Sequence, residues 1–449
     1  MVRSFDLFDT LLGRLRYFPH STYEMVEKQF PMPGFAFYRM AAEKKSDGTL
    51  AGIYRHLRQM LDLTRVQAKA LMDFEFRSDV SQLFPIPETL AQVQDGDLIV
   101  SDTFYSLSQI KQILKKIGLQ KRVHIYATPR GKYLGTIWDT VKKQHPVASH
   151  LGNFLHSDVH MAEKNGVRGV HFSDSELNPT EKAMLDFGQG DLGCLMRAVR
   201  LQNPYPVGSP EFLLWNEQCA LNVPLLIHAS LHLHAFCQKK KKRRVLFTSR
   251  DGCLWIQVFR TLFPEYESLY FQTSRFTYLF PTQTFIDYVR SIYSEDAMIV
   301  DLNGSGRSCR MFFKAHMKVP PLYYSIVNHK KRHFCILRKS FAHDGMEKMN
   351  YDLVGALYDV RGGQPMRSSL EYDLRYIRPS HACIAKCVEL LPFYHFDTFN
   401  AQIVDWAVSA MESRLELDNH IVHAKVHAHF EGAQCFHMLA SGLLVQTLS

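Results

Sequence analysis

The chain has 449 residues, of which 46% are hydrophobic and 22% are charged. These proportions are ordinary for a globular protein, and the length allows two or three domains with full cores. No stretch reaches the roughly 18 consecutive apolar residues of a membrane-spanning helix. The first residues lack the basic, apolar and small-residue succession of a signal peptide, because Asp6 and Asp9 interrupt it. We therefore expect a cytoplasmic protein without a membrane span.

The formal net charge of +9 is modest for this length and is partly concentrated in the run KKKKRR at residues 239–244. Such a run can attract nucleic acid, anionic lipid or another polyanion, with a steep salt dependence. It also follows a long helical pattern, and cations are favourable at the C-terminal end of a helix. We favour this second explanation and do not expect nucleic acid as a partner. The nine cysteines begin at Cys194 and form no C-x-x-C pair, which indicates reduced thiols in a reducing compartment.

The first polar cluster of the chain follows a short apolar start. In SFDLFDTLL, at residues 4–12, two carboxylates and a threonine interrupt apolar residues. This pattern is typical of a buried strand that ends in a polar loop at the carboxyl edge of a parallel sheet, where open α/β folds place their chemistry. A capped turn before a helix would give the same pattern, so the remaining strands decide between the two explanations.

Further strands along the chain end in the same way. About ninety residues of helical periodicity come first, and then the apolar run at 98–100 leads into Ser101. A strand at 123–127 precedes Lys132, and the segment GNFLHSD ends at Asp158 before a last strand at 167–172. Strands that alternate with helices at this spacing predict a doubly wound parallel sheet. A carboxylate nucleophile, a hydroxyl, an ammonium and a metal-binding carboxylate are the groups that transfer through an aspartyl ester requires.

These motifs resemble the haloacid dehalogenase (HAD) superfamily over the first 174 residues or so. The pattern Asp6-x-x-x-Thr10, Ser101, Lys132 and the segment from Gly152 to Asp158 match its four motifs in order. The resemblance implies a Rossmann-like sheet with a helical cap inserted between the first two motifs. It also implies catalytic roles for Asp6, Thr10, Ser101 and Lys132, and a Mg²⁺ ion bound by Asp6, Asn153 and Asp158. More narrowly, the stretches SFDLFDTLL, VSDTFYS and HSDVHMAEKNGV resemble HAD-like proteins associated with bacterial surface-glycan glycosyltransferases, which suggests glycan-biosynthesis enzymes as partners.

Two positions depart from the phosphatase pattern of the family. Phe8 stands where those phosphatases carry the aspartate that protonates the leaving group, and Asn153 stands where they carry a metal-binding aspartate. Loss of a general acid typically costs roughly 10²–10⁴-fold in rate, and an amide oxygen without charge binds Mg²⁺ more weakly than a carboxylate. Three interpretations stay open: a phosphatase with a shifted acid, a dehalogenase-like hydrolase that needs no acid, and a degenerate domain that binds without turnover.

A second α/β unit is expected beyond the Pro- and Gly-rich stretch at 203–210. Apolar strands at 245–248, 268–272 and 297–300 lead into the polar loops SRDG, TSR and DLNGSGRS. Arginine forks and a glycine-rich helix start can hold a phosphate or a carboxylate, although a tight turn with surface arginines explains the pattern too. The residues that we expect to bind a ligand there are Arg250, Asp251, Arg275, Asp301 and Arg307.

Two histidine groups have the spacing of metal ligands on one helix face, namely His228 with His232, and His420 with His423 and His427. Packing or solvent exposure explains both groups more simply in a chain with 22 histidines.

The expected fold is therefore a HAD-like α/β domain with a helical cap, a second α/β unit and a helical C-terminal region. We expect the first domain at 1–178 with its cap at about 13–95, a helical linker at 179–242, the second domain at 243–342, and a mostly helical region at 343–449. The function favoured at this point is Mg²⁺-dependent hydrolysis of a sugar phosphate or similar small phosphorylated metabolite, with Asp6 as nucleophile. The alternative is a non-catalytic HAD domain in a protein that binds a phosphorylated or glycan ligand.

Overall fold

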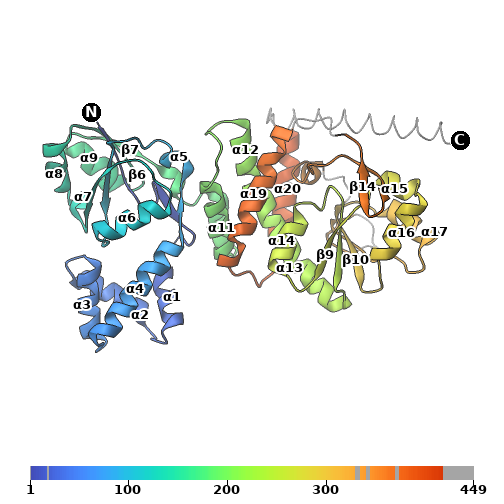
Figure 1. Cartoon of the computed structure of the whole chain (residues 1–449), viewed down its shortest axis with the longest axis horizontal. Coiled ribbons are helices and arrows are strands. Elements are labelled where there is room, and N and C mark those ends of the chain that lie inside the picture. Colours follow the sequence, from blue (N-terminus) through green and yellow to red (C-terminus); the bar gives the residue numbers. More distant parts are fainter. Residues whose placement is uncertain (1, 18–19, 329–333, 340–343, 370–373, 418–449) are drawn as a thin grey trace. The chain divides into compact units, whose positions relative to one another are not determined.

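The computed structural model describes residues 2–17, 20–328, 334–339, 344–369 and 374–417 (Figure 1). The chain divides into two compact units, Met1–Pro204 and Tyr205–Ser449. Each unit is built around its own five-stranded parallel sheet. The predicted α/β architecture with parallel sheets is thereby confirmed.

The sheet of the first unit has the strand order β5-β4-β1-β6-β7, so that β1 lies at its centre. The strands are β1 (Val2–Phe5), β4 (Leu98–Asp102), β5 (His124–Thr128), β6 (Val147–Gly152) and β7 (Arg168–His171). The connecting helical segments are α6 (Leu107–Lys116), α7 (Gly131–Leu134), α8 (Ile137–Gln144), η1 (Leu155–His160) and α9 (Met161–Lys164). Because all pairs are parallel, the carboxyl ends of the strands share one edge, where each strand leads into a loop.

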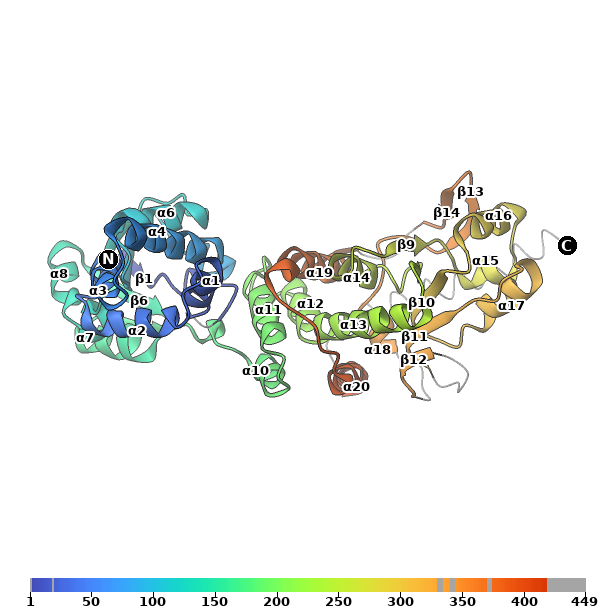
Figure 2. The ribbon, with the colours of Figure 1, turned by 90° about the horizontal axis from the view of Figure 1, so that it is seen from below.

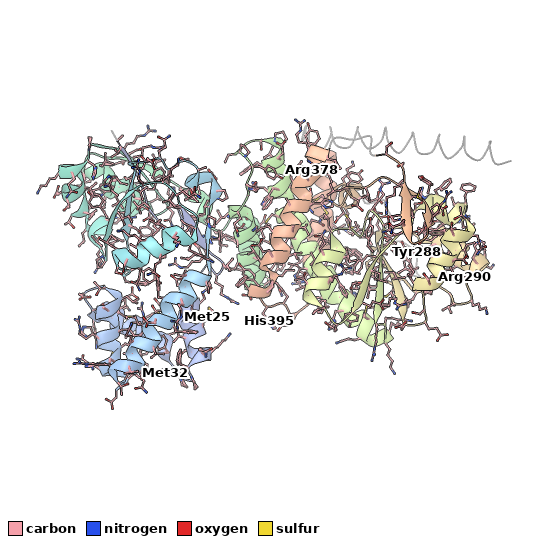
Figure 3. The ribbon with its side chains drawn as sticks, viewed as in Figure 1. Met25, Met32, Tyr288, Arg290, Arg378 and His395 are labelled. Atoms are coloured by element: carbon pink, nitrogen blue, oxygen red, sulfur yellow. The ribbon has the colours of Figure 1, made fainter. Side chains whose placement is uncertain are left out.

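A helical insert separates β1 from β4. It consists of α1 (Ser21–Gln29), α2 (Phe35–Lys45), α3 (Leu50–Met60) and α4 (Arg65–Ser81), coloured dark to light blue in Figure 1. A short antiparallel pair, β2 (Leu12–Arg14) with β3 (Leu83–Pro85), joins the insert to the sheet domain, and α5 (Pro87–Leu90) follows. The insert was predicted as helical, and the strand pair was not predicted, because three-residue strands leave no readable alternation. Met25 and Met32, labelled in Figure 3, lie in the insert.

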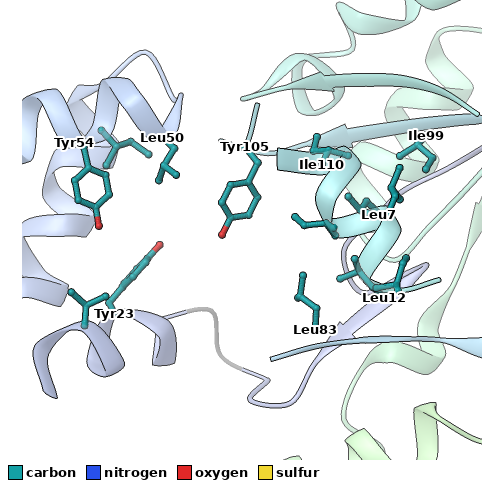
Figure 4. Close-up of a cluster of buried hydrophobic side chains, with 14 of the residues drawn as sticks. Leu7, Leu12, Tyr23, Leu50, Tyr54, Leu83, Ile99, Tyr105 and Ile110 are labelled. Atoms are coloured by element: carbon teal, nitrogen blue, oxygen red, sulfur yellow. The ribbon is translucent and has the colours of Figure 1, made fainter. Parts of the chain in front are cut away.

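The insert and the sheet share one buried apolar cluster, shown in Figure 4. Tyr105 lies between the two parts of this cluster, and its hydroxyl donates to the buried Asp79 carboxylate of α4 at 2.7 Å. Inside the insert, the fully buried Arg39 forms a forked ion pair with Glu75, whose carboxylate also accepts from Tyr54 at 2.7 Å. These satisfied buried polar groups fix how the insert helices pack, since an unpaired one would cost several kcal/mol.

The sheet of the second unit has the strand order β12-β11-β10-β8-β9. Figure 2 labels β12, β11, β10 and β9 of this sheet. Its strands are β8 (Arg244–Thr248), β9 (Glu267–Phe271), β10 (Ala297–Asn303), β11 (Tyr323–Val327) and β12 (Phe334–Leu337). The helices between them are α14 (Trp255–Leu262), α15 (Arg275–Leu279), α16 (Gln283–Ile292) and α17 (Arg307–His316). Tyr288 and Arg290 of α16 are labelled in Figure 3. Residues beyond this sheet add α18 (Asp344–Lys348), the hairpin β13 (Leu357–Arg361) with β14 (Gln364–Arg367), η4 (Leu374–Tyr376), α19 (Arg378–Leu390), η5 (Leu391–Phe393) and α20 (Ala401–Leu417).

The stretch predicted as a helical linker, 179–242, is divided between the two units. The segments η2 (Ser173–Ser175), α10 (Pro179–Asp186) and α11 (Gly190–Leu201) belong to the first, where Arg200 pairs with Glu181. The segments α12 (Pro210–Glu217), η3 (Gln218–Asn222) and α13 (Val223–Lys240) belong to the second. These helices bury most of their apolar residues, and helices of that kind form domain cores instead of linkers.

One helical stretch of the described residues, Pro210–Lys240, is long and apolar enough to cross a membrane. However, 72% of its most apolar window is buried inside the second unit. Burial of this kind is typical of the core helix of a globular domain, so the stretch gives no clear membrane span.

Candidate functional site

The central strand of the first sheet carries Asp6 at its carboxyl end. The backbone N–H of Asp6 continues the sheet ladder by donating to Leu151 O of β6 at 2.8 Å. The Asp6 side chain is only 8% exposed, although a carboxylate is rarely buried without a partner. The position is therefore both rigid and dry, which are properties that a reacting group requires.

Lys132 supplies the partner of this carboxylate. Its Nζ lies 2.6 Å from Asp6 Oδ1 and 2.5 Å from Asp158 Oδ1, and all three side chains are buried. The helix α7 that carries Lys132 is fixed by Asp102, the last residue of β4. The Asp102 carboxylate accepts from the backbone N–H of Lys132 at 2.8 Å and of Tyr133 at 2.7 Å. One ammonium is thus held between two carboxylates that come from different strand ends.

Asp158 is bound on every side by the protein. Besides Lys132, its carboxylate accepts from Phe154 N at 2.8 Å and contacts His150 Nε2 at 3.3 Å. The other ring nitrogen of His150 lies 2.9 Å from Ser4 Oγ. The turn between β6 and Asp158 requires a glycine, because a Cβ on Gly152 would lie 2.3 Å from the Asp158 carboxyl carbon. Asp158 is therefore placed to orient Lys132.

The pKa values follow from this arrangement. Burial, reinforced by the Asp158 charge and only partly offset by Lys132, raises the pKa of Asp6 to about 6. Burial also raises the pKa of Asp158, but His150 and Lys132 outweigh it and hold that pKa well below its usual range. The two carboxylates outweigh the burial of Lys132 and raise its pKa, whereas burial lowers the pKa of His150. At neutral pH the cluster carries one negative charge that no described cation neutralises.

Thr10 and Ser101, whose hydroxyls were predicted to take part in catalysis, are both buried. Thr10 follows in the loop after β1, and Ser101 lies in β4, the strand beside β1. The side-chain oxygens of both have no hydrogen-bond partner among the described residues. A buried hydroxyl without a partner costs about 1–3 kcal/mol, so such groups commonly await a ligand or a water.

The loop after β1 differs from that of an acid–base catalyst. The Phe8 ring lies under the Arg14 guanidinium at 4.4 Å and near the Tyr105 ring at 6.2 Å. Asp9 has a left-handed backbone, with φ of 52°, and its carboxylate is paired with the buried Arg197 of α11 at 2.7 Å. Asp9 is thus committed to a structural ion pair, and Phe8 stands where the pattern that the sequence resembles has its leaving-group acid.

The predicted metal-binding residues are Asp6, Asn153 and Asp158. Asp158 already has protein partners on both oxygens, so it fits a positioning role better than a metal-binding one. Asp6 offers its second oxygen, and the half-buried Asn153 follows β6, the strand beside β1. Mg²⁺ commonly takes one or two carboxylates and fills its other positions with water and phosphate oxygens. The donor set and the uncompensated negative charge fit such an ion.

A cavity of about 700 Å³ lies between the helical insert and the sheet domain. The insert contributes the apolar Leu50, Met72 and Phe76 together with Arg77. The sheet domain lines the cavity from Thr103 onward and at Ala127 and Pro129, whereas Asp6, Ser101 and Lys132 are not among the lining residues. This volume and the mixture of apolar and polar groups are those of a small-molecule pocket.

In the second unit, the structure brings together part of the predicted ligand set. Burial raises the pKa of Asp251 to about 7, with a further rise from Asp301, while the positive charges of Arg250 and Arg275 oppose it. Burial likewise raises the pKa of Asp301 to about 6, and Tyr323 donates to its carboxylate at 2.5 Å. Arg307 is exposed at the start of α17. Among the described residues, no ion pair joins these three arginines to the two aspartates.

The predicted histidine pair has ordinary packing partners. His228 Nδ1 accepts from Asn400 N at 3.3 Å, and His232 Nδ1 lies 2.6 Å from the Tyr324 hydroxyl. Burial lowers the pKa of His228 to about 4 and that of His232 less strongly, so both rings are neutral at pH 7. The histidines at 420, 423 and 427 lie outside the described residues.

Sequence reasoning missed three residues that build the first site: Asp102, His150 and Arg197. Asp102 carried a signal, because it directly follows Ser101 at the polar carboxyl end of a strand. His150 and Arg197 act on residues that are far away in the chain or on a neighbouring strand, so only the folded structure reveals them. No protein-family model matches the chain, and no curated protein matches it.

Proposed function

We propose that the first unit is a HAD-like hydrolase, a Mg²⁺-dependent phosphatase with Asp6 as the nucleophile. The observation that carries this proposal is the buried Lys132 shared by Asp6 and Asp158 at the carboxyl edge of the sheet. A single buried ion pair would have a smaller electrostatic cost than one ammonium between two carboxylates. The second carboxylate leaves Asp6 with a raised pKa and an excess negative charge, as is common at functional sites.

The strand topology supports the HAD assignment. Asp6 follows the central strand, Ser101 lies on the strand to one side, and Asp158 follows the strand to the other side. Lys132 follows the edge strand β5, and the helical insert lies between the first two motifs in the sequence. This is the order in which the family's motifs converge from separate strands, and it places the insert where the family has its cap.

The reaction divides into two displacements. Asp6 Oδ2 attacks phosphorus, the bond from phosphorus to the leaving-group oxygen breaks, and the leaving group departs as an anion with the electron pair. Lys132, which holds Asp6 Oδ1, orients the nucleophile and faces the developing charge. The hydroxyls of Thr10 and Ser101 are free to donate to phosphate oxygens. Water then attacks the phosphorus of the aspartyl phosphate and the bond from phosphorus to Asp6 Oδ2 breaks. The Asp6 carboxylate is regenerated, and inorganic phosphate leaves with the proton of the water. A bound Mg²⁺ ion would neutralise part of the negative charge of the Asp6 carboxylate and of the substrate phosphate.

The substrate class follows from the absence of an acid at position 8. With Phe8 packed against Arg14, and Asp9 paired with Arg197, no carboxyl group of this loop is placed to protonate a leaving alkoxide. We infer that the preferred substrates have leaving groups that depart as anions, such as acyl phosphates, phosphoanhydrides or aryl esters. Sugar phosphates, as alkyl esters, would react more slowly by roughly the 10²–10⁴-fold that an acid contributes.

The two departures from the phosphatase pattern favour a second candidate function, namely a domain that binds a phosphorylated or glycan ligand without turnover. Phe8 in the acid position and Asn153 in a metal position are the specific observations behind it. The two functions make opposite predictions, because binding alone needs neither Mg²⁺ nor an ionised Asp6.

Phosphate release from a substrate panel tests the proposal. The panel contains acetyl phosphate, p-nitrophenyl phosphate, a nucleoside diphosphate and several sugar phosphates, each with and without Mg²⁺. We expect release that requires Mg²⁺ and that is fastest for the first two compounds. If the folded protein binds members of the panel but releases no phosphate from any, the non-catalytic function is supported and the phosphatase is excluded for these classes.

A further inference from the structure

Three potential metal ligands meet in the second unit, beside the predicted ligand residues Arg250 and Asp251. The Tyr270 hydroxyl accepts from Arg250 N and donates to Asp352, one of the three. Cys253 precedes α14, Asp352 lies between α18 and β13, and His381 lies in the first turn of α19. One ligand atom from each residue lies within 4.8 Å of the other two. Among the residues that the structure describes, this is the one such group of three. Arg378, labelled in Figure 3, marks the start of the helix that carries His381.

Each of the three side chains is held in place by its neighbours. Cys253 is 8% exposed, and its Sγ lies 3.4 Å from Asn350 O. His381 Nε2 lies 2.8 Å from Tyr351 O. Asp352 Oδ1 accepts from Leu353 N at 2.6 Å, and its other oxygen accepts from the Tyr270 hydroxyl. Ligands oriented by backbone carbonyls and hydrogen-bonded carboxylates are typical of protein metal sites.

The segment that connects these residues is anchored independently. Asn350 is fully buried, and its amide exchanges hydrogen bonds with Asn222 at 3.0 and 3.2 Å. It also donates to Met346 O at 2.8 Å. The backbone that carries Asp352 and the two carbonyls is therefore fixed whether or not an ion is bound, which reduces the cost of assembling a site.

The group lies where an open α/β sheet binds its ligands. From β8 the chain passes to β9 on one side and returns to β10 on the other, so the connections diverge between β8 and β10. Ligands of such folds bind outside the carboxyl ends of the strands at this point. Cys253 follows β8 after a tight turn, in which a Cβ on Gly252 would lie 2.7 Å from Thr248 O. The sequence therefore brings a thiol to the divergence point by a turn that only glycine allows.

The donor types select the class of ion. Hard cations such as Mg²⁺ and Ca²⁺ take oxygen ligands, whereas a thiolate, an imidazole and a carboxylate together suit Zn²⁺. Three protein ligands leave a fourth tetrahedral position for water or a substrate atom, as in catalytic zinc sites. We propose that the second unit binds a zinc-class divalent ion through Cys253 Sγ, an oxygen of Asp352 and a ring nitrogen of His381. The site is independent of the one at Asp6.

Metal titration of the full-length, metal-stripped protein tests this proposal. With Co²⁺ as a probe, we expect the near-ultraviolet charge-transfer band of a thiolate–cobalt bond, saturating at one ion per chain. Zn²⁺ should displace the cobalt and raise the unfolding temperature of the wild type. The Cys253→Ser variant should lose the band, and His381→Gln or Asp352→Asn should weaken Zn²⁺ binding by about 10–100-fold or more.

Matched variants separate the site from other metal-binding residues of the chain. Cys309→Ser and His232→Gln change a buried cysteine and a half-buried histidine of the same unit and should leave the titration unchanged. A triple His→Ala variant at 420, 423 and 427 should retain the thiolate band even if it removes weak additional binding. Circular dichroism verifies that each variant is folded, and Asp352→Asn keeps the shape of the side chain it replaces. The proposal is overturned if the wild type gives no thiolate band, or if folded Cys253→Ser and Asp352→Asn bind Zn²⁺ as the wild type does.

Discussion

The Asp6→Asn variant should lose phosphate release by about 10⁴-fold or more while its first unit becomes more stable. Loss of a nucleophile that acts together with its positioning groups removes most of the catalysis above the background of binding. Lys132 keeps its second partner, Asp158, at 2.5 Å, so the substitution does not leave a buried ammonium without a carboxylate. Activity and stability should therefore change in opposite directions.

The sign of the stability change follows from the raised pKa of Asp6. In the folded protein this pKa is about 6, against an ordinary value of 3.8. Between these two values the unfolded chain has released the proton while the folded protein retains it, so stability falls as the pH rises through this window. Above pH 6 the wild type carries a penalty of order 1–3 kcal/mol that the asparagine lacks. Thermal unfolding should show the variant a few degrees more stable at pH 7 and nearly equal to the wild type at pH 4.

The exposed Asp139 on α8 provides the control for this experiment. Asp139→Asn should change neither phosphate release nor the pH dependence of unfolding, because the side chain is exposed. If Asp6→Asn is less stable than the wild type at pH 7, Asp6 is mainly a structural partner of Lys132. That result would contradict the proposal that the ionised Asp6 destabilises the first unit.

Phe8→Asp should accelerate hydrolysis of alkyl phosphates by about 10²–10⁴-fold, the contribution of a general acid. The variant places a carboxyl group in the loop position from which HAD phosphatases protonate their leaving groups. Acetyl phosphate and p-nitrophenyl phosphate should gain little, because their leaving groups depart as stable anions. The measured quantity is the ratio of kcat/KM for a sugar phosphate to that for p-nitrophenyl phosphate.

Phe8→Asn separates proton donation from the loss of the aromatic ring. Both substitutions remove the contact with Arg14, which is worth about 0.5–1 kcal/mol at a partly exposed site. Only the aspartate can donate a proton, so the asparagine variant should keep the wild-type ratio. An equal gain for both variants would show that the ring blocks access to the site, and that leaving-group protonation is not what limits the wild type.

The first site was predictable from strand ends, because parallel strands place their carboxyl ends together. Asp6, Ser101 and Lys132 each follow an apolar run by a few residues, and the structure has them at one edge of one sheet. The paired state of Asp9 was not predictable, since its partner Arg197 lies 188 residues away. Asp158 was expected near a metal, but its position against Lys132 and His150 depends on side-chain directions that no spacing reveals.

The second unit shows the same limit more strongly. Its parallel sheet and the polar loops after β8 and β10 were predicted from short apolar strands. Asp352 and His381 lie about 100 and 128 residues after Cys253 in the chain, yet the three side chains meet in the fold. Cysteines scattered without a C-x-x-C pair were interpreted as reduced thiols, and six of the eight described ones lie on helical segments of the two units. Only tertiary structure distinguishes the thiol that has potential co-ligands.

The most direct test of the account is to trap the covalent intermediate on Asp6. The wild-type protein is mixed with acetyl phosphate and Mg²⁺, quenched in acid within the first turnover, digested and mapped by mass spectrometry. The account predicts a phosphoryl group on the carboxylate of Asp6, and no such group in Asp6→Asn. Phosphate release by the wild type without label on Asp6, at a rate that Asp6→Asn retains, would contradict it.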